Sequence, residues 1–95
     1  MSLVDKLLRR KKVDPDARRR HLIQFGRITD GVILDAQLNG NGEEVVFYTY
    51  TLNGVDLESS EVLTEEQRRS PAKYAPGAKV AIRYDQRNQG NSIVE

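Results

Sequence analysis

The fold is decided by residues 45–54, which read VVFYTYTLNG. β-Branched and aromatic residues suit a pleated, half-buried surface, so Val45 to Leu52 is predicted to form a strand. Asn53-Gly54 supplies the two positive-φ positions that a two-residue type I′ turn requires. Residues 55–60 then alternate between apolar and polar, which predicts a further strand paired antiparallel with the preceding one in a hairpin.

Another strand is predicted before this hairpin. From Thr29 the sequence alternates, with Val32, Leu34 and Ala36 on the face that we expect to be buried. The following Asn-Gly-Asn-Gly, residues 39–42, favours a hairpin loop over a phosphate-binding loop because it lies between two strands.

The C-terminal third predicts one short helix and two more strands. Thr64 and Gln67 match the capping-box pattern, so a helix is expected over roughly residues 65–70, ending near Pro71. Pro76-Gly77 fits the centre of a type II turn that leads into a strand over residues 78–84. A polar turn and a short closing strand at residues 92–94 follow.

Two helices are predicted at the N-terminal end. The first starts at Ser2 and places Leu3, Val4, Leu7 and Leu8 on one face, followed by a basic run at residues 9–12. The second begins after Asp14 as N-cap, with Pro15 at the first helical position, and runs to about Phe25. We expect Leu22 and Phe25 to point inward and Arg18, Arg19 and Arg20 to point outward.

These elements predict a mainly β protein, a small five-stranded antiparallel barrel or curled sheet with an N-terminal helical arm and one short helix. The arm is assigned to residues 1–26 and the β domain to residues 27–95. The predicted core consists of Val32, Leu34, Val46, Tyr48, Tyr50, Leu52, Leu57, Val80, Ile82 and Tyr84, with Leu22 and Phe25 closing an open end.

Charge is distributed unevenly along the chain. The first 30 residues hold nine Lys or Arg and four Asp, a net charge of +5, whereas the remaining residues hold six and ten, a net charge of −4. A basic arm on an acidic body favours an anionic partner or surface, or an arm that pairs with its own body. Because an apolar signal-peptide core is missing from the N-terminus, we expect a cytoplasmic protein, or one at the membrane periphery.

Catalytic, cofactor and metal sites are not expected. The chain has no cysteine, which excludes disulfides and thiolate chemistry, and His21 is its one histidine. The carboxylates on or beside the strands alternate with core residues, so they are interpreted as the wet face of a sheet. The sequence therefore favours a protein that is not an enzyme.

The order of signals over roughly residues 26–95 resembles a widespread bacterial family known only as a domain of unknown function, whose members commonly follow membrane helices. The resemblance rests on residues spread along the domain: Gly26, Gly31, Val32, Phe47, Tyr48, Tyr50, Asn53, Gly54, Tyr74, Gly77, Val80, Ile82, Tyr84, Asp85 and Asn88. Gln86 and Gln89 stand where prolines are usual in that family. The resemblance implies a compact five-stranded β-barrel or curled sheet and does not indicate an activity.

A non-catalytic protein-interaction or scaffolding module is the leading functional hypothesis, because sheet edges and an amphipathic arm are both docking surfaces. Its partner is expected to be another protein or a second copy of the chain. The alternatives are docking of the basic arm on an anionic membrane, and single-stranded nucleic-acid binding on an OB-like sheet face. The candidate interaction surface consists of Leu3, Leu7, Arg9, Arg10, Arg27, Phe47 and Arg83.

Overall fold

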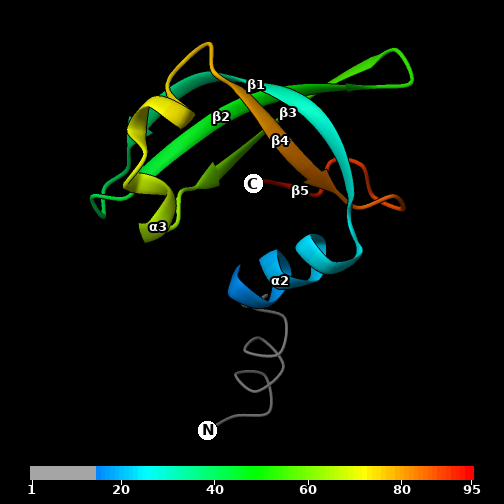
Figure 1. The fold of residues 1–95 in the computed structure, drawn as a ribbon, viewed down its shortest axis with the longest axis horizontal. Coiled ribbons are helices and arrows are strands. Elements are labelled where there is room, and N and C mark those ends of the chain that lie inside the picture. The colour runs from blue at the N-terminus through cyan, green and yellow to red at the C-terminus, as the bar shows by residue number, and fades with distance from the viewer. Residues whose placement is uncertain (1–14) are drawn as a thin grey trace, which may run out of the picture.

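The computed structural model describes residues 15–95 and confirms the predicted mainly β class. Five antiparallel strands form one sheet in the order β3-β2-β1-β4-β5, curled into a half barrel (Figure 1). The strands are β1 (Arg27–Leu38), β2 (Glu44–Leu52), β3 (Val55–Val62), β4 (Lys79–Tyr84) and β5 (Ser92–Val94). The helices are α2 (Pro15–Phe25), α3 (Glu65–Arg68) and the 3-10 helix η1 (Pro71–Tyr74).

The predicted hairpin is present. β2 pairs antiparallel with β3 along its whole length, from Val45 opposite Val62 to Leu52 opposite Val55. Asn53 and Gly54 have φ values of 52° and 80°, as a type I′ turn requires. The turn therefore fixes the register that places alternate β2 residues in the core.

β1 is the longest strand and belongs to two pairings. Its first half pairs with β4 and its second half with β2, and Gly31 is shared, opposite both Tyr50 and Val80. A Cβ atom at Gly31 would lie 2.6 Å from Ile82 Cγ1 and 2.9 Å from the Thr49 carbonyl oxygen. Only glycine fits where the two halves of the curled sheet meet.

The predicted burial of Val32 and Leu34 is wrong. Gly31 and Ile33 point into the core instead, and a β-bulge between Ile33 and Asp35 leaves Leu34 without a partner in the register. The extra residue shifts the alternation, because Leu34 and Asp35 both face outward before Ala36 turns inward again.

The core of the half barrel is confirmed in its other members. Six predicted residues are buried, namely Val46, Tyr48, Tyr50, Leu52, Val80 and Ile82. Leu57 and Tyr84 are half-buried against them. Ile33, Leu63, Tyr74 and Val94 complete the buried cluster.

Helix α2 lies beneath the arch of the sheet and contacts β4 and β5 (Figure 1). Leu22 is buried as predicted, but Phe25 is 67% exposed and packs its ring near His21 on the outer side of the helix. Arg18 and Arg19, predicted to point outward, are half-buried on the side that faces the sheet, whereas Arg20 is exposed. Arg18 and Arg19 face inward because the sheet and the start of β5 offer them oxygen acceptors. The division at residue 26 between arm and domain stays a prediction.

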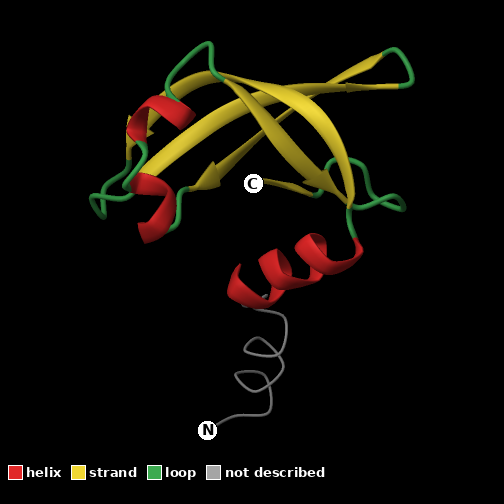
Figure 2. Cartoon of the chain, in the orientation of Figure 1, coloured by secondary structure: helices red, strands yellow, loops and turns green. Residues whose placement is uncertain are grey.

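The two short helices lie at one end of the sheet (Figure 2). The capping box is present: Thr64 accepts a hydrogen bond from the Gln67 backbone N–H, and the Gln67 side chain accepts one from the Thr64 backbone N–H. α3 ends at Arg68, two residues earlier than predicted, because Pro71 disfavours helical geometry at the preceding Ser70. The type II turn closes as predicted, with the Ala78 N–H donating to the Ala75 carbonyl at 2.9 Å.

Candidate functional site

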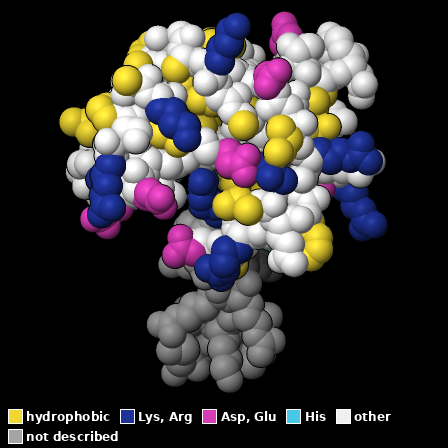
Figure 3. Space-filling model, in the orientation of Figure 1, with side chains coloured by type: hydrophobic (Ala, Val, Ile, Leu, Met, Phe, Trp, Pro, Cys, Tyr) yellow, Lys and Arg dark blue, Asp and Glu magenta, His cyan; other side chains and the backbone are white. Residues whose placement is uncertain are grey.

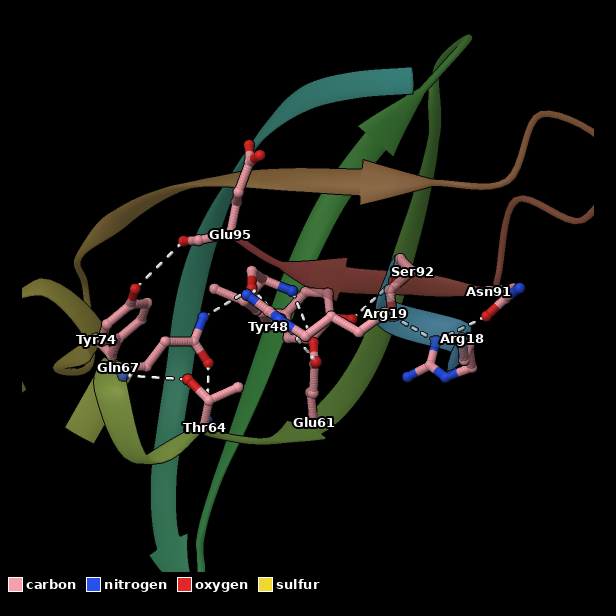
Figure 4. A network of polar contacts seen from close by, with 11 residues as sticks. Arg18, Arg19, Tyr48, Glu61, Thr64, Gln67, Tyr74, Asn91, Ser92 and Glu95 are labelled. Carbon is pink, nitrogen blue, oxygen red and sulfur yellow. Dashed lines mark hydrogen bonds and ion pairs between the residues drawn. The ribbon is translucent and has the colours of Figure 1, made fainter. Parts of the chain in front are cut away.

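Glu61 bridges the two free edges of the sheet. β3 and β5 are the outermost strands, and the curl of the sheet brings them into contact. The Val94 backbone N–H donates to Glu61 Oε2 at 2.7 Å (Figure 4). A side-chain carboxylate therefore links β3 to β5 at this point, where a closed barrel would have a backbone ladder.

Arg19 ties helix α2 to the same point. Its guanidinium lies 3.2 Å from Glu61 Oε1 and donates to the Val94 carbonyl oxygen at 3.0 Å. The two side chains of this ion pair are only 20% and 10% exposed. One arginine thus connects α2, β3 and β5.

Gln67 adds hydrogen bonds on the other side of the seam, which is the contact between β3 and β5. Its Nε2 donates to the Val94 carbonyl oxygen at 2.8 Å, while its Oε1 accepts from the Thr64 N–H at 3.0 Å. The residue that caps α3 therefore also holds α3 against β5, and the Val94 carbonyl accepts from both Arg19 and Gln67 (Figure 4).

A second group of contacts fastens the start of β5. Arg18 donates to Asn91 Oδ1 at 2.7 Å and to the Ser92 carbonyl oxygen at 3.1 Å. The Ser92 hydroxyl lies 2.7 Å from the Tyr48 hydroxyl inside the core. The short strand β5 is thereby held by α2 on one face and by β2 on the other.

Burial shifts the pKa of two groups in this network. It raises the pKa of Glu61 above its ordinary value, and the hydrogen bond from Val94 and the charge of Arg19 oppose the rise. Burial likewise raises the pKa of the Tyr48 hydroxyl, against the hydrogen bond to Ser92. Throughout residues 15–95, every buried side-chain nitrogen or oxygen has a hydrogen-bond partner. The network is therefore satisfied internally and acts as a structural clasp.

The sheet surface opposite the core carries a different kind of feature. Val32, Leu34 and Phe47 are 37%, 46% and 37% exposed, and together we call them the outer patch. Leu34 and Phe47 line one shallow hollow, and Val32 lies opposite Thr49, the next outward residue after Phe47 on β2. The outward residues of β1 and β2 thus place apolar side chains side by side in water.

Carboxylates neighbour the outer patch. Asp35 lies opposite Phe47 in the register, Glu58 lines the hollow with Leu34 and Phe47, and Asp30 lines a second hollow with Val32 and Lys79. Three acidic groups and one ammonium group therefore surround the patch. Its electrostatic character is negative.

The predicted surface residues do not form one site. Phe47 belongs to the outer patch, but Arg27 lies eight residues before the Phe47 partner Asp35 on β1, which is roughly 26 Å along the strand. Arg83 is half-buried and bonded to Glu95 at 3.1 Å and to the Gly26 carbonyl. The predicted Leu3, Leu7, Arg9 and Arg10 lie outside the described residues.

The inward orientation of Glu61 could have been predicted from the sequence but was not. Extending the alternation of Leu57 and Ser59 by two residues places Glu61 on the inward face of β3, and an inward carboxylate requires a partner. The partner, Arg19, had no such signal, because a run of three arginines does not show which one faces the sheet.

Residues 26–95 match the family model described as Domain of unknown function (DUF3592). The chain belongs to this family. The match covers all five strands of the DUF3592 domain and begins just after α2, so Arg18 and Arg19 reach into the domain from outside the matched segment. No curated protein and no solved structure gives a significant match.

Two further observations concern the described part of the chain. Between residues 15 and 95, no helix has the length and apolarity needed to cross a membrane. Over the same range, His, Asp and Glu side chains do not gather in groups of three or more that could hold a metal ion.

Proposed function

We propose that this DUF3592 domain is a non-catalytic protein-interaction module that binds another protein chain through the outer patch of Val32, Leu34 and Phe47. The observation that carries the proposal is the exposure of these three adjacent apolar side chains on the sheet surface opposite the core. Apolar area left in water costs roughly 25 cal/mol per Å², and a docked partner recovers that free energy.

The bulge at Leu34 supports this assignment. Because Ile33 lies opposite Tyr48, a regular β1 would place Leu34 opposite Phe47 and turn Asp35 inward. The bulge keeps Leu34 in one hollow with Phe47 and turns Asp35 outward beside them. Bulges commonly re-aim a side chain at a functional surface. The bulge in β1 therefore lies where the exposed apolar residues meet.

The chemistry around the patch favours protein over nucleic acid. Asp30, Asp35 and Glu58 would repel phosphates, and Tyr48 and Tyr50 are buried, which leaves Phe47 without a second strand aromatic for base stacking. On the face drawn in Figure 3, Lys and Arg side chains are spread among Asp and Glu and do not gather into a basic stripe. Both features favour a partner with apolar and basic side chains.

The proposal is tested with a photo-reactive amino acid placed at position 47 of the full chain in its native cells. Phe25, a more exposed phenylalanine on α2, is the matched control position. We expect protein adducts at position 47 that excess wild-type chain displaces and a Leu34→Ser/Phe47→Ser chain does not. Adducts removed by nuclease, adducts with lipid, or equal displacement by both chains would refute the proposal.

A further inference from the structure

We infer that the outer patch is occupied by the basic amphipathic segment of residues 2–12 from a second copy of this chain. This inference rests on the proposed function, because it names the partner of the same patch.

The two surfaces are complementary in type. The outer patch offers three apolar side chains beside Asp30, Asp35 and Glu58. Residues 2–12 contain four apolar residues at helical spacing and five basic residues, namely Leu3, Val4, Leu7 and Leu8, and Lys6, Arg9, Arg10, Lys11 and Lys12. A segment of this kind buries its stripe in an apolar surface while its cations meet the surrounding carboxylates.

The segment cannot easily reach the patch of its own chain. α2 begins at Pro15 beneath the arch and is fastened to β5 and β3 by Arg18 and Arg19, on the side away from the outer patch (Figure 1). The two residues between the segment and α2 span at most about 7 Å when extended, so the segment starts from the side of α2 beneath the arch. To lay its whole apolar stripe on the patch of its own chain, it would have to pass around the edge of the sheet to the far surface, beyond a sheet layer and a core of about 10 Å. A neighbouring copy can present its patch without this detour.

Exchange between two copies gives a closed assembly. If the segment of each copy binds the patch of the other, both contacts form together and the complex ends at two chains. The second contact forms within an existing complex, so two short segments that bind weakly alone hold the pair together. The expected assembly is a symmetric dimer whose affinity falls as salt rises, since charge pairs contribute to it.

Sedimentation of full-length variants tests this inference. The arm variant is Leu3→Ser/Leu7→Ser and the face variant is Leu34→Ser/Phe47→Ser. The matched control, Leu38→Ser/Phe25→Ser, changes the same residue types at exposed positions outside the patch. We expect wild type and control to dimerise, and the arm and face variants each to weaken dimerisation at least tenfold. A mixture of the two weakened variants should associate more tightly than either variant alone and less tightly than wild type, because one intact arm then meets one intact patch.

A spin-label experiment shows where the segment binds. The chain has no cysteine, so Lys11→Cys gives a single site for a nitroxide label. The spin-labelled chain is mixed with isotope-labelled wild-type chain, whose amide signals are recorded. The nitroxide should broaden the signals of Val32, Leu34 and Phe47 in the isotope-labelled copy and leave those of Arg18 and Arg19 unchanged.

The outcomes separate the two proposals. The inference about the arm would be overturned by a monomeric wild type, by a mixture that associates no more tightly than either variant alone, or by broadening that spares the patch. If the arm variant still associates while the face variant does not, the patch remains an interaction surface and only its assigned occupant is wrong. Loss of the displaceable adducts at position 47 would instead overturn the proposed function itself.

Discussion

Arg19 on α2 and Glu61 on β3 form a half-buried ion pair of 3.2 Å across the seam where the curled sheet fails to close. Both groups also bond Val94 on β5, through its carbonyl and its N–H respectively. Three elements far apart in the sequence are thereby joined at one residue of the last strand. This clasp keeps the sheet curled, and the curl gives the outer patch its exposed, convex setting.

Removal of the Arg19 side chain should destabilise the domain. Arg19→Ala leaves Glu61 with the single hydrogen bond from Val94, and a half-buried carboxylate without its cation costs about 1–3 kcal/mol. Arg20→Ala, one position along the same helix and exposed, should change the unfolding free energy by less than about 0.5 kcal/mol. Urea denaturation of both variants measures the difference. Equal losses would mean that the ion pair contributes nothing specific.

The clasp should also give stability a particular dependence on pH. Burial raises the folded-state pKa of Glu61 above its ordinary value of 4.5, so the folded protein holds this proton more tightly than the unfolded chain. The contribution of Glu61 is therefore largest below pH 4.5 and falls as pH rises from there through the raised pKa. Subtracting the unfolding free energy of Glu61→Gln at each pH removes the effect of other carboxylates. A difference that grows with rising pH would contradict this assignment.

Gly31 should not tolerate a methyl group. In Gly31→Ala the new Cβ would meet Ile82 Cγ1 at 2.6 Å, and the overpacking should cost about 1–3 kcal/mol. Gly40→Ala is the matched control, since its Cβ would meet no atom within 4 Å. Thermal unfolding should separate the two variants by several degrees, given a domain of this size. A similar melting temperature for both would show that β1 can relax at the crossing.

Neighbouring residues on β1 should respond in opposite ways to truncation. Ile33 is fully enclosed, so Ile33→Ala should cost about 2–4 kcal/mol through the cavity that it leaves. Leu34 faces water at the bulge, so Leu34→Ala should cost less than about 1 kcal/mol. Chemical denaturation compares them directly. The reverse order would restore the alternation expected from the sequence and remove the outer patch.

This pair of residues also shows how far the sequence predicts the fold. The hairpin of β2 and β3 was predictable because local chemistry decides it: alternation sets the faces of Tyr48 and Tyr50, and Asn53-Gly54 sets the turn. Which β1 residues face the core was not predictable, because Gly31 must lie under Ile82 and the bulge then shifts the alternation. Both causes are tertiary contacts that no pattern within residues 27–38 reveals.

The clasp and the patch were likewise predictable only in part. Phe47 was predictable as an outward aromatic, since it alternates with Val46 and Tyr48. The inward Arg19 and the exposed Phe25 were not predictable. The apolar spacing of α2 places Leu22 and Phe25 on one side, but the hydrogen-bond acceptors on β5 decide which side of the helix faces the sheet. On a weakly apolar helix, polar contacts outweigh the apolar pattern.

The claim that a second copy of the chain binds the outer patch is tested most directly by following amide NMR signals of the full chain as it is concentrated. Signals of Val32, Leu34 and Phe47 should shift with concentration, and the shifts should disappear in the Leu34→Ser/Phe47→Ser chain. Signals of the clasp residues Arg19, Glu61 and Val94 should stay in place. Shifts confined to α2 or the seam, with the patch unchanged, would contradict the account.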